Sequence, residues 1–241
     1  MPMLKDVVQR LKRVVGAADP DQQENEYWRE LTDGEIRRRV HRQFVGGMWD
    51  EIGRLQFDFM VSQGLRPEHK LLDVGCGALR GGIHFVRYLE PGHYFGIDRN
   101  RSLVRAGRVE LAACGLATRG ATLRVDSRFD ASAFGVRFDY VLAVSLFTHL
   151  YANHIVRCLG EVKSVLSEAG KFYATFFEAP HPAYARDLVH APGGVTTHLD
   201  SDPFHYSIQE ISAYARFVGM RSDYIGEWGH PRAQIMLSFT H

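Results

Sequence analysis

Short apolar runs alternate with amphipathic stretches from Lys70 to the end of the chain. The apolar runs predict seven strands, at about residues 70–75, 94–98, 121–125, 138–144, 171–177, 221–227 and 233–239. The intervening stretches predict helices at about residues 82–89, 101–114, 151–167 and 207–218. Because strands and helices alternate, we expect right-handed crossovers and an α/β fold with a mostly parallel, seven-stranded sheet.

The last two predicted strands depart from this alternation. Only Trp228 to Arg232 separates them, which is too short for a crossover helix. We therefore expect a C-terminal hairpin that adds an antiparallel strand to the sheet.

Helices precede the first strand. Apolar residues at helical spacing between Leu4 and Val15 predict a basic amphipathic helix, and the polar stretch 17–26 reads as a linker. Thr32 and Glu35 form a capping-box pattern that opens a helix to about Arg42. A further helix follows the Gly46-Gly47 break and ends near residue 64. We divide the chain into an N-terminal helical cap, residues 1–66, and an α/β domain, residues 67–241.

The first helix has two interpretations. A basic amphipathic helix can lie on a membrane surface, but no Trp or Phe anchors its apolar face. We favour a helix docked on its own domain or on a second subunit, which makes a homodimer through the N-terminal helices possible.

Composition narrows the class of protein. A formal net charge of +1 gives no overall field that would attract nucleic acid, so no nucleic-acid partner is favoured. The three cysteines show no C-x-x-C spacing, which argues against a disulfide framework and a zinc site and favours a cytoplasmic location. No run approaches 18 apolar residues, so we expect no membrane span.

The stretch Leu71 to Gly82 carries the clearest chemistry. An apolar strand runs into Asp73-x-Gly75-x-Gly77, where glycines let the backbone approach a ligand and the following helix offers its N-terminus. A dinucleotide fingerprint would need glycine or alanine at position 80, where this chain has arginine. The turn therefore predicts a site for a nucleotide-like cofactor other than a dinucleotide.

Asp73-x-Gly75-x-Gly77, followed by Asp98 at the end of the next strand, resembles motifs I and II of class I S-adenosylmethionine-dependent methyltransferases. The resemblance covers roughly residues 67–241 and implies a Rossmann-like sheet in which strand seven lies between strands five and six. Where the family often has a third alternating glycine, this chain has Leu79, which puts the local shape of the loop in question.

The resemblance implies S-adenosyl-L-methionine as the cofactor and assigns roles to individual residues. Asp98 would accept the ribose hydroxyls, and Asp126 with Ser127 would contact adenine, although an Asp-Ser turn is an equal alternative for that pair. Asp73 would order the loop or reach the methionine ammonium. The complete expected cofactor-binding set is Asp73, Gly75, Cys76, Gly77, Asp98, Arg99, Asp126, Ser127 and Ser145.

The fourth strand runs into Ser145-Leu-Phe-Thr-His149-Leu150, similar to a segment of many small-molecule methyltransferases. It is not the Asn/Asp-Pro-Pro-Tyr/Phe motif that binds a planar amine or amide, so base methylation is disfavoured. A hydroxyl acceptor needs a base, and imidazole titrates near neutrality. Candidate catalytic residues are His149, His181 and His205, with His149 favoured because the strand aims it at the reacting centre.

The loop from Glu178 to Pro203 is long for a strand–helix connection and suits a lid over the acceptor pocket. Histidines 181, 190, 198 and 205 might instead ligate a metal, but they lack i, i+4 spacing, and no metal is required.

We expect an S-adenosylmethionine-dependent methyltransferase that acts on a small-molecule acceptor, most plausibly at oxygen. The alternatives are N- or C-methylation of another acceptor, including protein or RNA, and a non-catalytic cofactor-binding partner subunit. An NAD-dependent oxidoreductase is a further alternative, against which Arg80 and the absence of a Tyr-x-x-x-Lys pair argue.

Overall fold

The computed structural model describes residues 28–180 and 188–241. The expected first helix, the linker at residues 17–26 and His181 lie outside the described residues.

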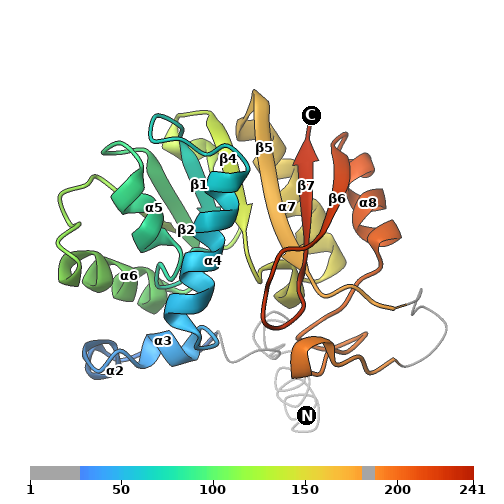
Figure 1. Ribbon diagram of the computed structural model, residues 1–241, viewed down its shortest axis with the longest axis horizontal. Helices are drawn as coiled ribbons and strands as arrows, with labels where there is room; N and C mark the ends of the chain where they lie inside the picture. Colours follow the sequence, from blue (N-terminus) through green and yellow to red (C-terminus); the bar gives the residue numbers. More distant parts are fainter. Residues whose placement is uncertain (1–27, 181–187) are drawn as a thin grey trace, which may run out of the picture.

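One seven-stranded sheet forms the centre of the described structure (Figure 1). The strand order is β3-β2-β1-β4-β5-β7-β6, and β7 is antiparallel to both of its neighbours. This confirms the expected Rossmann-like α/β fold, including the C-terminal hairpin and the insertion of the last strand. The strands are β1 (Leu71–Val74), β2 (Tyr94–Asp98), β3 (Thr122–Val125), β4 (Phe138–Ala143), β5 (Leu166–Phe176), β6 (Arg221–Glu227) and β7 (Ile235–Thr240).

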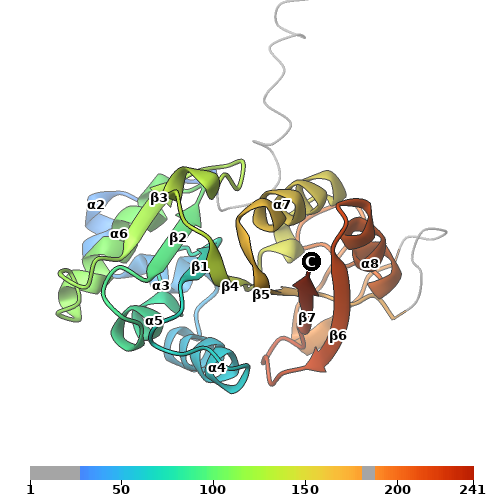
Figure 2. The same ribbon diagram turned by 90° about the horizontal axis from the view of Figure 1, so that it is seen from above.

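Helices cover both faces of the sheet, which is why β1 and β4 are almost continuously apolar and buried. Helices α4 (Trp49–Ser62) and α5 (Gly82–Tyr88) lie on one face, and α7 (Ala152–Val165) and α8 (Ile208–Phe217) lie on the other (Figure 2). Helix α6 (Arg101–Ala113) packs against β2 and β3. The two faces have separate apolar cores, with Phe85 in one and Phe172 in the other.

Two predicted boundaries were wrong. Strand β5 begins at Leu166 instead of residue 171, because Leu166 pairs with Phe138 ahead of a register shift in the β4–β5 ladder. The cap helix predicted to run from Thr32 to Arg42 is two helices, α2 (Asp33–Arg37) and α3 (Val40–Phe44). The chain breaks between them at Arg39, whose φ is 60°, although the capping box at Thr32 forms as expected.

A buried ion pair attaches the cap to the domain. Glu110 of α6 is 1% exposed and accepts hydrogen bonds from His41 Nε2 at 2.8 Å and from Arg42 Nε and Nη2 at 2.8 and 2.7 Å. The break at Arg39 begins the short helix that carries both donors. The cap is therefore held to α6 by charged hydrogen bonds to an acid that is itself buried.

The turn between α3 and α4 is held from two directions. Arg80, from the glycine-rich loop, donates to the carbonyls of Val45 and Gly47, each at 3.1 Å. Arg232, from the β6–β7 hairpin, donates to the carbonyl of Gly46 at 2.6 Å. Burial lowers the pKa of His230 to about 4, and the positive charges of Arg80 and Arg232 add to this effect.

Among the described residues, no helix combines the length and the apolar character needed to cross a membrane.

Candidate active site

A cavity of about 640 Å³ opens at the carboxyl ends of β1, β2, β3 and β4, a size typical of sites for small ligands. The parallel strands deliver residues that are far apart in the sequence to this one edge. All nine residues of the expected cofactor-binding set line the cavity, and His149 lines it as well. These residues are Asp73, Gly75, Cys76, Gly77, Asp98, Arg99, Asp126, Ser127, Ser145 and His149.

The glycine-rich loop after β1 adopts left-handed backbone conformations. Gly75 and Gly77 have φ angles of 75° and 53°, which glycine adopts without steric cost. Leu79 also has a positive φ, 68°, although it is not glycine, and its side chain is fully buried. At the position of the family's third glycine, Leu79 thus has the left-handed backbone conformation, and its side chain packs in the core.

Asp73 is buried behind this loop and is 6% exposed. Tyr94 donates a hydrogen bond to its Oδ2 at 2.7 Å. Burial raises the pKa of Asp73 to about 7, an increase that the Tyr94 hydroxyl partly offsets and the nearby Asp98 carboxylate reinforces. Gly82 makes room for this pair, because a Cβ at that position would lie 2.5 Å from the Tyr94 hydroxyl oxygen.

Asp98 ends β2 and anchors the floor of the cavity. Its Oδ2 accepts from the backbone N–H of Gly77 at 2.9 Å, and its Oδ1 accepts from that of Asn100 at 2.7 Å. Burial raises the pKa of Asp98 despite these two hydrogen bonds. Each carboxylate oxygen keeps a further lone pair, so the group is suited to accept two hydroxyl hydrogens.

Asp126 lies just beyond β3, at the far end of the same edge. Its Oδ1 accepts from the backbone N–H groups of Arg128 and Asp130 at 2.7 and 3.1 Å. Its Oδ2 is 4.0 Å from the Arg124 guanidinium, beyond hydrogen-bond distance. Asp126 and Asp98 therefore place two carboxylates at the same edge of the cavity.

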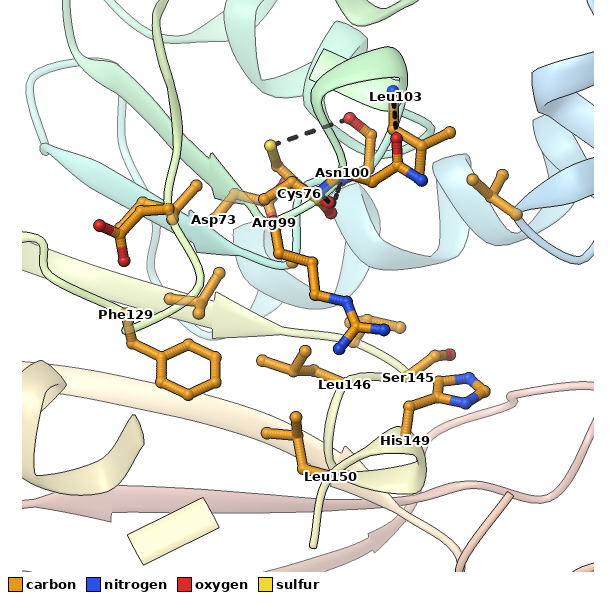
Figure 3. A pocket seen from close by; sticks show the side chains of 18 of the residues that line it. Asp73, Cys76, Arg99, Asn100, Leu103, Phe129, Ser145, Leu146, His149 and Leu150 are labelled. Atoms are coloured by element: carbon orange, nitrogen blue, oxygen red, sulfur yellow. Dashed lines mark hydrogen bonds between the residues drawn. The ribbon is translucent and has the colours of Figure 1, made fainter. Parts of the chain in front are cut away.

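Arg99 extends from the end of β2 across the cavity towards Leu146, as Figure 3 shows. Its guanidinium carbon lies 3.7 Å from the centroid of the Trp28 ring, a cation–π contact. The cap is joined to the same place by Asn100 Nδ2, which donates to the carbonyl of Arg29 at 3.0 Å. The cap and β2 therefore meet over the nucleoside end of the cavity.

His149 lies in a 3-10 turn, η4 (Phe147–His149), directly after β4. Its Nδ1 forms a short contact with Oδ1 of Asp202, whose side chain is 5% exposed. Asp202 belongs to the long loop between β5 and α8. An acid at Nδ1 fixes the ring and selects the tautomer in which Nε2 carries the lone pair.

The β5–α8 loop is held against η4 by one backbone hydrogen bond and one from a side chain. Phe204 N–H donates to the carbonyl of Thr148 at 2.8 Å, and the Tyr206 hydroxyl donates to the carbonyl of Leu150 at 2.6 Å. These bonds flank His149 and bring Asp202 to it. The loop predicted as a lid therefore supplies a partner for the favoured histidine.

The other candidate bases are placed differently. His205 is 2% exposed, its Nδ1 bonds Thr197 Oγ1 at 2.8 Å, and its ring does not line the cavity, so the geometry does not support a catalytic role. His181 lies outside the described residues. Among residues 28–180 and 188–241, no three His, Cys, Asp or Glu side chains form a group able to hold a metal ion.

Trp49, at the start of α4, does not line the cavity. The Trp49 ring packs edge-on against His41 and under the Arg42 guanidinium, 4.8 Å away, so it joins the cap to the domain.

The sequence interpretation missed Trp28 and Asp202. The sequence pointed to Asp202 only by its position three residues before the candidate base His205. Its distance along the chain from His149 gave no indication that the two side chains pair.

Residues 72–172 match the family model described as a methyltransferase domain. The matched range begins in β1 and ends in β5, so it contains Asp73, Asp98, Asp126 and His149.

Solved structures share the fold at low sequence identity. The CcbJ methyltransferase from Streptomyces caelestis aligns with a TM-score of 0.60 at 14% identity, covering 78% of this chain and 88% of that one. An S-adenosylmethionine-dependent methyltransferase from Clostridium acetobutylicum aligns with a TM-score of 0.60 at 11% identity, covering 87% and 99%. Magnesium protoporphyrin IX methyltransferase from Synechocystis, with bound S-adenosylhomocysteine, aligns with a TM-score of 0.55 at 14% identity, covering 79% and 84%.

Proposed function

We propose that the chain is a class I methyltransferase that takes its methyl group from S-adenosylmethionine and transfers it to a hydroxyl of a small-molecule acceptor. The observation that carries this proposal is the His149–Asp202 pair beside the cavity that holds the three cofactor acids.

Residues that follow different strands bind different parts of the cofactor. Asp98 accepts the ribose hydroxyls, Asp126 Oδ2 accepts the exocyclic amine of adenine, and Arg99 with Trp28 covers the base. Asp73 faces the ammonium of the methionine part, with Gly75 and Gly77 giving close backbone approach. Cys76 and Ser127 complete the walls of this half of the cavity. Ser145 lies beyond it, on the side of His149 (Figure 3).

When bound, S-adenosylmethionine supplies a methyl group on a sulfonium that departs as a neutral thioether. The cavity walls would align the acceptor hydroxyl with that methyl group and exclude water, and this alignment would contribute most of the rate enhancement. The acceptor's hydroxyl proton passes to Nε2 of His149. Asp202 holds the ring in the competent tautomer and stabilises the imidazolium that forms.

The test is release of S-adenosylhomocysteine with a panel of hydroxyl and amine acceptors. We expect His149→Ala to lower kcat by about 10²–10⁴ while the dissociation constant for S-adenosylmethionine stays within twofold. The loss should shrink for acceptors with more acidic hydroxyls. His69→Ala is the matched control, because that imidazole precedes β1 at the opposite edge of the sheet.

Retention of most turnover by His149→Ala would show that His149 is structural. Turnover of amines but not of alcohols, with no dependence on His149, would favour N-methylation instead.

Three broader expectations stay proposals. These are the division at residue 66 into cap and domain, a cytoplasmic location, and a homodimer through the N-terminal helices. The first of these helices lies outside the described residues. The three free cysteines are consistent with a reducing compartment. Sedimentation of the full chain beside a chain lacking residues 1–27 tests the dimer.

A further inference from the structure

A buried polar network joins three strands at the edge of the cavity next to His149. Ser145 follows β4, Thr175 lies in β5, and Gln234 precedes β7. Gln234 Oε1 accepts from Thr175 Oγ1 at 2.6 Å and from Ser145 Oγ at 3.1 Å, and Thr175 Oγ1 accepts from the Ser145 N–H at 2.7 Å. Thr175 is fully buried and Gln234 is 3% exposed, so these groups satisfy one another instead of water.

The network fixes where each proton lies. The Thr175 hydroxyl receives the Ser145 N–H, so its own proton needs an acceptor, and Gln234 Oε1 is the acceptor at hydrogen-bond distance. The Gln234 amide is therefore oriented with its oxygen towards both hydroxyls. Ser145 gives its hydroxyl proton to that oxygen, which leaves the lone pairs of Ser145 Oγ for other donors.

The backbone presents this serine to the cavity. Ser145 has a φ of 58°, a conformation that costs free energy for a residue other than glycine and that accumulates at functional sites. Thr148 Oγ1 donates to the Ser145 carbonyl at 3.0 Å, which ties the serine to the turn that carries His149. Both Ser145 and His149 line the cavity, and Figure 3 shows their side chains among the residues around it.

Both side chains can act as hydrogen-bond acceptors. Ser145 Oγ can do so because its own proton is donated to Gln234, and His149 Nε2 can do so because Asp202 selects the tautomer with the proton on Nδ1. Two neighbouring acceptors match a substrate with two neighbouring donors. Resting on the function proposed above, we propose that the methyl acceptor is a vicinal diol. One hydroxyl gives its proton to His149 and is methylated, the second donates to Ser145, and Gln234 is the positioning residue that keeps Ser145 an acceptor.

Matched acceptor pairs that differ by one hydroxyl test this proposal: catechol with phenol, and cis-cyclohexane-1,2-diol with cyclohexanol. The readouts are kcat/KM from S-adenosylhomocysteine release and, in parallel, the rise in Tm that each acceptor causes with S-adenosylhomocysteine bound. One hydrogen bond corresponds to a preference of about tenfold for the diol. Ser145→Ala and Gln234→Leu should each reduce the diol to mono-alcohol ratio to about one, and Ser164→Ala, exposed on α7, should keep the wild-type ratio.

The outcomes separate the two proposals. Equal kcat/KM for diols and mono-alcohols, or a ratio that survives in both Ser145→Ala and Gln234→Leu, overturns the vicinal-diol assignment and leaves O-methylation standing. An absence of both turnover and thermal stabilisation with every hydroxyl acceptor overturns O-methylation and the diol assignment together. If Ser145→Ala does not fold, Gln234→Leu decides the question, since it leaves the serine in place.

Discussion

Replacing Asp73 by asparagine should remove a pH dependence of stability that this carboxyl imposes on the ligand-free protein. The side chain is 6% exposed, and burial raises its pKa from 3.8 to about 7. In the unfolded chain the same group ionises near its ordinary value, so between about pH 4 and pH 7 the folded state holds one more proton.

The sign follows from proton linkage. Where the folded state binds the extra proton, the free energy of unfolding falls as pH rises, by about 1.4 kcal/mol per pH unit. The contribution is fully present below about pH 4 and lost once the pH exceeds about 7, a total of about 4 kcal/mol over the shift from 3.8 to about 7. Asparagine does not titrate, so this part of the slope disappears in the variant.

Urea unfolding at pH 5, 6, 7 and 8 measures the effect, with free energies extrapolated to water for both proteins. The difference between variant and wild type should change by about 2 kcal/mol from pH 5 to pH 7, in favour of the variant at the higher pH. Tyr94→Phe is the control that keeps the carboxyl. It removes the hydroxyl that offsets the effect of burial, so its loss of stability with pH should extend to higher pH.

Parallel stability curves for wild type and Asp73→Asn between pH 5 and pH 8 would refute the argument, because they would show that Asp73 is ionised in the folded state throughout this range.

Three further outcomes follow from single contacts. Asp98→Ala should raise the S-adenosylmethionine dissociation constant tens-fold or more in calorimetry, since two hydrogen bonds to a carboxylate are each worth about 1.5–3 kcal/mol; an unchanged constant would remove Asp98 from the ribose site. Glu110→Ala leaves His41 and Arg42 without their acid and should cost about 3–5 kcal/mol in urea unfolding, whereas a loss below 1 kcal/mol would mean that the cap contributes little. Asp202→Asn should lower kcat by about 10²–10⁴ with cofactor affinity retained, and wild-type turnover would show that His149 needs no acid at Nδ1.

The sequence was sufficient for the sheet and for the group of acids that gathers at its carboxyl edge. Strands that are buried on both faces of a sheet are runs of apolar residues, so β1 and β4 can be recognised as buried strands from the sequence. Asp98 and Asp126 each follow directly on a predicted strand, and the carboxyl ends of parallel strands share one edge. Their proximity in space therefore follows from local pattern and one topological rule.

Contacts set by loop packing were not predictable in this way. Asp202 reaches His149 across 53 residues through a loop whose path depends on backbone bonds to Thr148 and Leu150. His205 lies close by in sequence, yet the same packing places it in the interior of the loop. The break at Arg39 lies next to His41 and Arg42, whose tertiary partner Glu110 is about 70 residues further along the chain.

The order of the strands has a consequence for how such a protein can diversify. The acids that we assign to the cofactor lie between Asp73 and Asp126, and the residues that we assign to the acceptor begin at Ser145. The segment from Ala131 to Arg137 crosses from the outer strand β3 to the central strand β4 between these two blocks. A recombination event within that crossover would exchange one acceptor pocket for another and leave the cofactor acids intact, so chimaeras joined there are a direct route to altered acceptor range.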